Sequence, residues 1–265
     1  MGQPRFLYRA LILAALPLLA GCGADVPAEP KAADATAVIY GDGSGAKSQK
    51  IDRRPEMAGT ITGRVRYTGA KRPRPKWDLA DDFCVHAHPD GLRKEGVNVN
   101  EKGEVRNVYV SIKEGLGAET WPPPGDVLVL NQEGCTYVPH VFGIQVGQNL
   151  DIKNSDPILH NVHYVPVRNK EQNLSQTGGK VDRVQFLKPE SAVRIFCEVH
   201  NWMMCWAHVT NHPFFAVSGE DGSFTLRNVP PGSFKVTAWH EELGELTLEV
   251  EVKSKESAQL EFEYK

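Results

Sequence analysis

Short runs of alternating apolar and polar residues recur along the chain from about residue 59 onward. The clearest runs cover residues 61–67, 105–112, 127–130, 224–226, 234–239 and 246–252. Successive side chains of a β-strand point to opposite faces, so this period of two predicts strands with one buried and one solvent-facing side. No segment keeps apolar residues at the helical spacing of 3.6 between capping residues, so we expect any helix to be short.

Clusters of glycine and proline separate these runs, as at residues 122–125 (PPPG), 221–222 (DG) and 230–232 (PPG). The chain has 24 Gly and 18 Pro among 265 residues, a turn-rich composition that suits many short strands. The sequence therefore predicts an all-β fold, with the strands packed as sandwiches.

The N-terminus has the layout of an export signal. Arg5 and Arg9 precede an apolar run over residues 10–20, which is shorter than the ~20 residues that a membrane-spanning helix needs. The end of this run, residues 19–22 (LAGC), resembles the lipobox of bacterial lipoproteins. That resemblance implies cleavage before Cys22, a lipid on its thiol, and a protein anchored in the periplasm or at the cell surface. Because Gly rather than Asp follows the cysteine, an outer membrane is favoured.

Residues 23 to about 57 show no periodicity and are rich in Ala, Gly, Asp, Pro and Lys. Such a composition cannot bury enough apolar surface to offset the entropy of the chain. We predict a flexible tether that holds the folded part away from the membrane.

Residues 220–224 (EDGSF) and 228–234 (NVPPGSF) resemble two successive strands of the carboxypeptidase regulatory-like (transthyretin-like) sandwich. In that family a D-G-x-F strand is followed by a P-P-G-x-Y/F strand. The resemblance implies that residues 59–65 and 105–112 supply earlier strands, so that the central segment is an insertion in this sandwich. Two tandem domains are the alternative.

Histidine, cysteine and methionine concentrate in two further segments, residues 154–163 (NSDPILHNVH) and 196–204 (FCEVHNWMM). An imidazole in the first segment, with a thiolate, an imidazole and a thioether in the second, forms a mixed ligand set. Such a set suits copper, which cycles between a soft Cu(I) and a borderline Cu(II). Zinc fits less well, because a structural zinc site needs four firm donors and a thioether is a poor one.

These two segments resemble the N-x5-H-N-V-H and C-x2-H-x2-M motifs of amicyanin-type cupredoxins. The resemblance implies that His160, Cys197 and His200 are equatorial ligands of one mononuclear type 1 copper ion and that Met203 is its axial ligand. It implies that Asn154 is not itself a ligand but hydrogen-bonds across the two ligand loops and stiffens them. The implied activity is a one-electron relay in which no bond of a substrate changes.

The two resemblances together imply a cupredoxin Greek-key sandwich packed with a carboxypeptidase regulatory-like sandwich. The predicted divisions are a signal peptide (1–21), a tether (22–57), N-terminal strands of the regulatory-like sandwich (58–124), a cupredoxin domain (125–210) and the C-terminal part of the regulatory-like sandwich (211–265).

Several alternatives remain open around the copper motif. Met204 replaces Met203 as axial ligand if the register shifts, and either side chain could instead fill core space. His163 is interpreted as a second-shell or strand-surface residue. In cupredoxins the imidazole that corresponds to His200 emerges through an apolar surface patch and serves as the electron port. Trp202 either lies on the rim of such a patch or seals the site from water.

The chain has 5 Cys. With Cys22 assigned to the lipid and Cys197 to the metal, an exported chain favours a disulfide among the rest, and we predict Cys84–Cys135. Closing this loop of about fifty residues would contribute ~3–4 kcal/mol in the chain-entropy model. Cys205 is then a buried free thiol that acts as a small hydrophobic residue, with a contact to the metal as the alternative.

Composition narrows the function classes further. The formal net charge is -3, which gives no indication of nucleic-acid binding. Hydrophobic residues make up 41% of the chain and charged ones 24%, near the averages of soluble domains, which excludes a mostly disordered or polytopic membrane protein. The glycine signatures of nucleotide-binding proteins and of serine hydrolases do not occur, and we expect no enzyme.

The leading hypothesis is thus an extracytoplasmic, lipid-anchored blue-copper protein that transfers single electrons to and from a redox protein partner. It would contact the membrane through its N-terminal lipid alone. The alternatives are a copper-binding or copper-delivery lipoprotein without a redox role, and a metal-free adhesion or assembly module.

Overall fold

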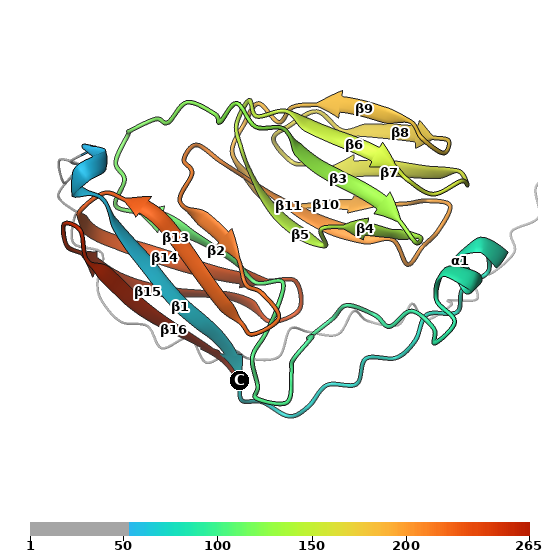
Figure 1. Ribbon diagram of the computed structural model, residues 1–265, viewed down its shortest axis with the longest axis horizontal. Coiled ribbons are helices and arrows are strands. Elements are labelled where there is room, and N and C mark those ends of the chain that lie inside the picture. Colours follow the sequence, from blue (N-terminus) through green and yellow to red (C-terminus); the bar gives the residue numbers. More distant parts are fainter. Residues whose placement is uncertain (1–52) are drawn as a thin grey trace, which may run out of the picture. The chain divides into compact units, whose positions relative to one another are not determined.

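Strands dominate the computed structural model, which describes residues 53–265 (Figure 1). The all-β prediction is confirmed. Within the described residues the α-helical content is one short segment, α1 (Asp82–Ala87), preceded by the 3-10 turn η1 (Pro55–Met57). The predicted signal peptide, Cys22 and most of the predicted tether lie outside the described residues. No helix in the described part is long and apolar enough to cross a membrane.

A first group of strands forms two sheets, with orders β13-β1-β16 and β12-β2-β14-β15. Its members are β1 (Gly59–Tyr67), β2 (Tyr109–Glu114), β12 (Phe215–Val217), β13 (Ser223–Val229), β14 (Gly232–His240), β15 (Gly244–Val252) and β16 (Ser257–Tyr264). These strands share one buried apolar cluster that includes Ile61, Val110, Leu226, Val236 and Phe262.

Segments from both ends of the described chain pair within these sheets. β1 runs antiparallel to β13 and parallel to β16, and β2 lies between β12 and β14. The turn before β13 needs glycine, because Gly222 has φ +67° and a Cβ there would lie 2.6 Å from the carbonyl oxygen of Val65. β2 begins later than the run at 105–112 predicts, because Asn107 has φ 62° and interrupts the extended backbone.

A second group of strands forms two further sheets, with orders β5-β11-β10-β7-β8 and β4-β3-β6-β9. Its members are β3 (Leu128–Glu133), β4 (Thr136–Val138), β5 (Val141–Gln145), β6 (Leu150–Asn154), β7 (His160–Val165), β8 (Gln172–Gln176), β9 (Val181–Val184), β10 (Glu190–Phe196) and β11 (Met204–Thr210). A separate apolar cluster fills this group, with Leu130, Ile144, Ile152, Val162 and Ile195 among its fully buried members.

Strand register in the second group sets the position of the candidate ligands. Phe196, the last residue of β10, lies opposite His163 of β7 on one side and Met204 of β11 on the other. The 197–203 loop therefore leaves the sheet beside the start of β7, where His160 is the first strand residue. Two segments that are nearly forty residues apart in sequence meet at this end of the sheet.

Candidate metal centre

Three buried side chains from these two segments converge. One donor atom from each of His160, Cys197 and His200 lies within 4.8 Å of the other two. The Nδ1 atoms of the two imidazoles are 2.8 Å apart, and Nδ1 of His200 is 4.0 Å from Sγ of Cys197. None of the three residues is more than 4% exposed.

The spacing of these donors suits one small ion. Metal–nitrogen bonds of about 2.0 Å and metal–sulfur bonds of about 2.3 Å span nitrogen–nitrogen and nitrogen–sulfur distances of about 3–4 Å. One sulfur and two imidazole nitrogens form a donor set that binds copper in both of its common oxidation states. The side chains present therefore fit the predicted metal.

The Cys197 thiol is poised to ionise. Burial raises its pKa, but hydrogen bonds from His160 and from the backbone amides of Asn161 and His200 outweigh burial, so the pKa of Cys197 lies below its usual range. The two amide nitrogens are 3.5 and 3.4 Å from the sulfur. Because the thiolate is the form that binds metals, this environment prepares the side chain as a ligand.

The ligand loop 197–203 is closed by its own backbone. The amide of Met203 donates to the carbonyl of His200, and the amide of Cys197 donates to the carbonyl of Met203. Met203 is 1% exposed and belongs to the core cluster that contains Cys197. Met204 is half-buried, and its sulfur accepts a hydrogen bond from the Arg194 guanidinium at 3.4 Å.

Asn154 stiffens the first ligand loop from within. Its side-chain amide donates to the carbonyls of Ile158 and Gln176, and its side-chain oxygen accepts from the backbone of Asp156. The bonds between the two ligand loops are instead made by Asn161, whose side-chain oxygen accepts from the amides of Glu198 and Val199. The sequence analysis did not single out Asn161, although it is the middle residue of the H-N-V motif.

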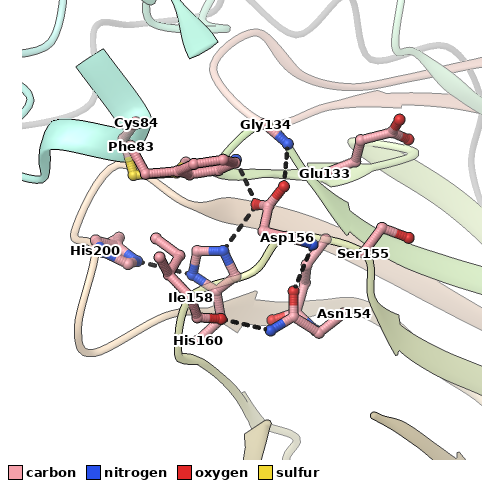
Figure 2. A network of polar contacts seen from close by, with 12 residues as sticks. Phe83, Cys84, Glu133, Gly134, Asn154, Ser155, Asp156, Ile158, His160 and His200 are labelled. Atoms are coloured by element: carbon pink, nitrogen blue, oxygen red, sulfur yellow. Dashed lines mark hydrogen bonds and ion pairs between the residues drawn. A yellow bond between two sulfur atoms is a disulfide. The ribbon is translucent and has the colours of Figure 1, made fainter. Parts of the chain in front are cut away.

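Asp156 is a second site residue that the sequence analysis missed. One carboxylate oxygen lies 2.8 Å from Nε2 of His160 and 2.7 Å from the amide of Cys135, and the other accepts from the amide of Gly134 (Figure 2). Burial alone would lower the pKa of His160, but its bonds with Cys197 and Asp156 outweigh burial and raise it. Asp156 thus orients the imidazole with its Nδ1 toward Cys197 and His200. The sequence signal that could have indicated Asp156 is its position four residues before the candidate ligand His160.

The predicted Cys84–Cys135 disulfide is present, and both sulfurs belong to fully buried residues. Asp156, His160 and Cys135 also form a cluster of metal-binding residue types, but the Cys135 sulfur is bonded to Cys84 and is not a free donor. Cys205 is a buried free thiol whose pKa burial raises well above its usual value.

His163 makes its polar contacts with residues outside this cluster. Its two ring nitrogens lie 2.8 Å from Glu171 and 2.9 Å from Glu198, and both carboxylates are about half exposed. Of the two interpretations of His163, the strand surface is the one that matches these contacts.

The residues around α1 (77–92, here called the α1 segment) contact His200 through Asp81. Asp81 caps α1 through the amides of Phe83 and Cys84, and its carboxylate lies 4.0 Å from Nε2 of His200. Figure 2 includes Phe83 and Cys84 in the same network of polar contacts as His200 and His160. Trp202, 8% exposed, donates from its indole to the carbonyl of Cys135, as the sealing interpretation of this residue requires.

Three solved structures that resemble part of this chain are a copper-containing nitrite reductase, an amicyanin and a purple cupredoxin. A copper-containing nitrite reductase from Thermus scotoductus is 20% identical over 37% of this chain, with a TM-score of 0.31. Amicyanin from Paracoccus versutus is 18% identical over 38% of this chain and 97% of its own, with a TM-score of 0.30. A purple cupredoxin from Nitrosopumilus maritimus is 19% identical over 32% of this chain and 98% of its own, with a TM-score of 0.27.

The chain spans a quarter of the length of the nitrite reductase. No protein-family model and no curated protein matches it. TM-scores near 0.3 do not place the chain in a family.

Proposed function

We propose that this protein is a mononuclear type 1 copper protein that transfers single electrons. The observation that carries the proposal is the convergence of a buried, readily ionised Cys197 with two buried imidazoles, His160 and His200. Met203, whose backbone closes the same loop, is the candidate fourth ligand. Bound copper would alternate between Cu(I) and Cu(II) and thereby carry one electron.

The surrounding hydrogen bonds support a rigid site. Asn161 ties the 197–203 loop to β7, and Asp156 holds His160 against the turn at Gly134. A site that barely rearranges when its charge changes favours rapid electron transfer. Asn161 and Asp156 are the residues that hold the candidate ligands in place, and residues that orient ligands commonly affect metal affinity and activity.

The visible and electron-paramagnetic-resonance spectra of the full chain with one equivalent of Cu(II) test the proposal. We expect an intense visible band from thiolate-to-copper charge transfer. Cys197→Ser should abolish the band, whereas Cys205→Ser, which alters the other buried free thiol, should keep it. A colourless copper complex of the unaltered chain would reject the type 1 site.

Copper storage or delivery is the second candidate function, and the burial of His200 favours it. An imidazole that is 4% exposed offers a redox partner little direct contact. Electron self-exchange and copper transfer to a chelator, measured on the same copper-loaded sample, separate the two functions. Fast exchange with slow copper loss supports electron transfer, and the reverse supports delivery.

We further propose that the protein works outside the cytoplasm, anchored by a lipid on Cys22. The buried Cys84–Cys135 disulfide supports an oxidising compartment. Mass spectrometry of the N-terminal peptide from membranes should show a lipid-sized mass increase on Cys22 that Cys22→Ser lacks. An unmodified Cys22 in the membrane fraction would contradict the anchor.

A further inference from the structure

The two sides of the candidate metal centre differ in how closed they are. On the histidine side, Leu79 and Phe83 of the α1 segment pack against the core cluster of the second strand group, and Asp81 lies 4.0 Å from Nε2 of His200. The Cys84–Cys135 disulfide fixes this segment to the β3–β4 turn, where His88 also contacts the carbonyl of Gly134 at 2.6 Å. His200 therefore lies beneath a covalently attached cover.

On the methionine side lies a cavity of about 450 Å³. Trp202, Met203 and Met204 line it, together with Trp77, Val138 and Glu241. Met203 is adjacent in the backbone hydrogen bonding to both Cys197 and His200. Trp77 and Leu92, at the two ends of the α1 segment, form part of its wall, whereas Asp81, which contacts His200, does not line it. The cavity thus reaches the candidate fourth ligand away from the Asp81–His200 contact.

The cavity wall suits a soft cation. Its lining includes two methionines, Met203 and Met204, which carry the thioether donor that Cu(I) prefers, and the Trp202 indole, a ring type that attracts cations. The Met204 sulfur also accepts a bond from Arg194, at 3.4 Å. Glu241 is 8% exposed at its side chain and is bonded to His140 and to the Trp206 indole at 2.7 Å each. Arg93, Lys94 and Arg106 also line the cavity; the Lys94 ammonium lies 4.2 Å from the centre of the Trp77 ring, and Arg106 pairs with Glu220.

We propose that copper reaches and leaves this centre as Cu(I) from the methionine side, through the cavity lined by Met203 and Met204, while the α1 segment closes the histidine side. The proposal rests on the copper site proposed above. It assigns Met204 a role as a transient donor on the route and explains two adjacent methionines where the ligand motif needs one.

A matched pair of substitutions tests the route. Val138 and Val129 are 49% and 47% exposed on the neighbouring strands β4 and β3, and of the two Val138 lines the cavity. Val138→Trp narrows the cavity, and Val129→Trp is the control. We expect Val138→Trp to slow Cu(I) uptake from the bicinchoninate complex by about tenfold, an added barrier of about 1.4 kcal/mol, with an unchanged final spectrum after oxidation.

A second experiment, without metal, tests whether small molecules reach Met203 through the same cavity. Hydrogen peroxide converts a thioether to a sulfoxide and water, and peptide mass spectrometry reads this change at Met203. Val138→Trp should slow sulfoxide formation at Met203 in the copper-free chain, whereas Val129→Trp should leave its rate unchanged.

The combination of Cys84→Ser with Cys135→Ser loosens the cover and identifies the competing route. Uptake that Val138→Trp leaves unchanged, but that the double serine variant accelerates tenfold, would overturn the proposal and place access at His200. If the unaltered chain takes up no copper while Val138→Trp still protects Met203, the cavity gives access to Met203, but the proposed copper site fails and the copper route fails with it.

Discussion

His160 and His208 are almost equally buried, at 0% and 2% exposure, yet their surroundings shift their pKa values in opposite directions. Burial lowers the pKa of both rings, and for His208 nothing offsets it, so its pKa falls to about 3. For His160, bonds with Cys197 and Asp156 outweigh burial and raise the pKa. Burial alone keeps the His208 imidazole neutral, whereas the sulfur and the carboxylate beside His160 place its ring in a cluster of metal-binding groups.

The contacts of His208 fit this distinction. Its ring stacks on Tyr109 at 4.0 Å and meets Trp239 at 4.6 Å, and its Nδ1 accepts a long bond from the Ala192 amide. Its Nε2 has no hydrogen-bond partner within residues 53–265. His208 therefore serves packing, and a change there should spare the metal site.

The largest expected effect is on copper binding when each histidine is replaced in turn. His160→Ala removes a proposed ligand, so we expect copper affinity to fall by more than about a hundredfold, beyond the usual cost of losing a residue that orients a ligand. His208→Ala should leave affinity and the visible band within about twofold of the unaltered chain. Competition with a chelator of known affinity measures both. Equal losses would erase the distinction between the two rings.

The second largest expected effect is on the free energy of unfolding when the disulfide is lost. The disulfide lies near His160, because Cys135 and His160 belong to one cluster. Cys84 and Cys135 are 51 residues apart, so replacing both by serine should lower the free energy of unfolding by about 3–4 kcal/mol. Denaturant titration measures the change. The control is the same comparison with the unaltered chain reduced by dithiothreitol, where the difference should vanish. A loss that survives reduction would mean that the serines, rather than the missing cross-link, destabilise the fold.

The free energy of unfolding in acid should depend on His208, the histidine that serves packing. The pKa of His208 is about 3 when folded and about 6.5 when unfolded, so the unfolded chain binds more protons as pH falls below 6.5 and stability is lost. At pH 5 this one group costs about 2 kcal/mol relative to neutral pH. His208→Phe should remove that loss and keep the stack on Tyr109. The measurement is the free energy of unfolding at pH 5 and pH 7.

His212 and His240, with pKa values of about 4, continue to destabilise the His208→Phe variant in acid, so its pH dependence should flatten without vanishing. Tyr109→Phe is the control, because burial raises the pKa of that hydroxyl and it takes up no proton in acid. A pH dependence identical in His208→Phe and the unaltered chain would contradict the assignment.

Alternation in the sequence was sufficient for the all-β class and for several strands, and the resemblance of the two ligand segments to cupredoxin motifs predicted that His160, Cys197 and His200 meet. Alternation specifies which face of a strand is buried, and loop length keeps His200 close to Cys197. The cover over His200 was not predictable in this way. Asp81 and His200 are more than a hundred residues apart, and the six residues of α1 carry no periodic signal of what they pack against.

The hydrogen-bond partners of the polar side chains around the site could not be predicted from the sequence either. Asn154 and Asn161 are both asparagines next to the ligand motif, and the loop conformation decides that Asn161 bridges the two loops. Asp156 shows the same limit, because its two partners at Gly134 and Cys135 come from a turn about twenty residues earlier.

The smallest expected effect concerns the carboxylate that makes His160 unlike His208. Asp156→Asn keeps the size of the side chain but removes the charge beside Nε2 of His160, which weakens the imidazole as a donor. We expect copper affinity to fall by about tenfold, at the low end for residues that orient a ligand. Asp151→Asn is the matched control, since Asp151 lies on β6 in an ion pair with Arg183, away from the cluster. Asp156→Glu should recover part of the affinity if charge is what matters. An Asp156→Asn variant with unchanged affinity and an unchanged spectrum would show that burial with Cys197 nearby is enough to make His160 a ligand.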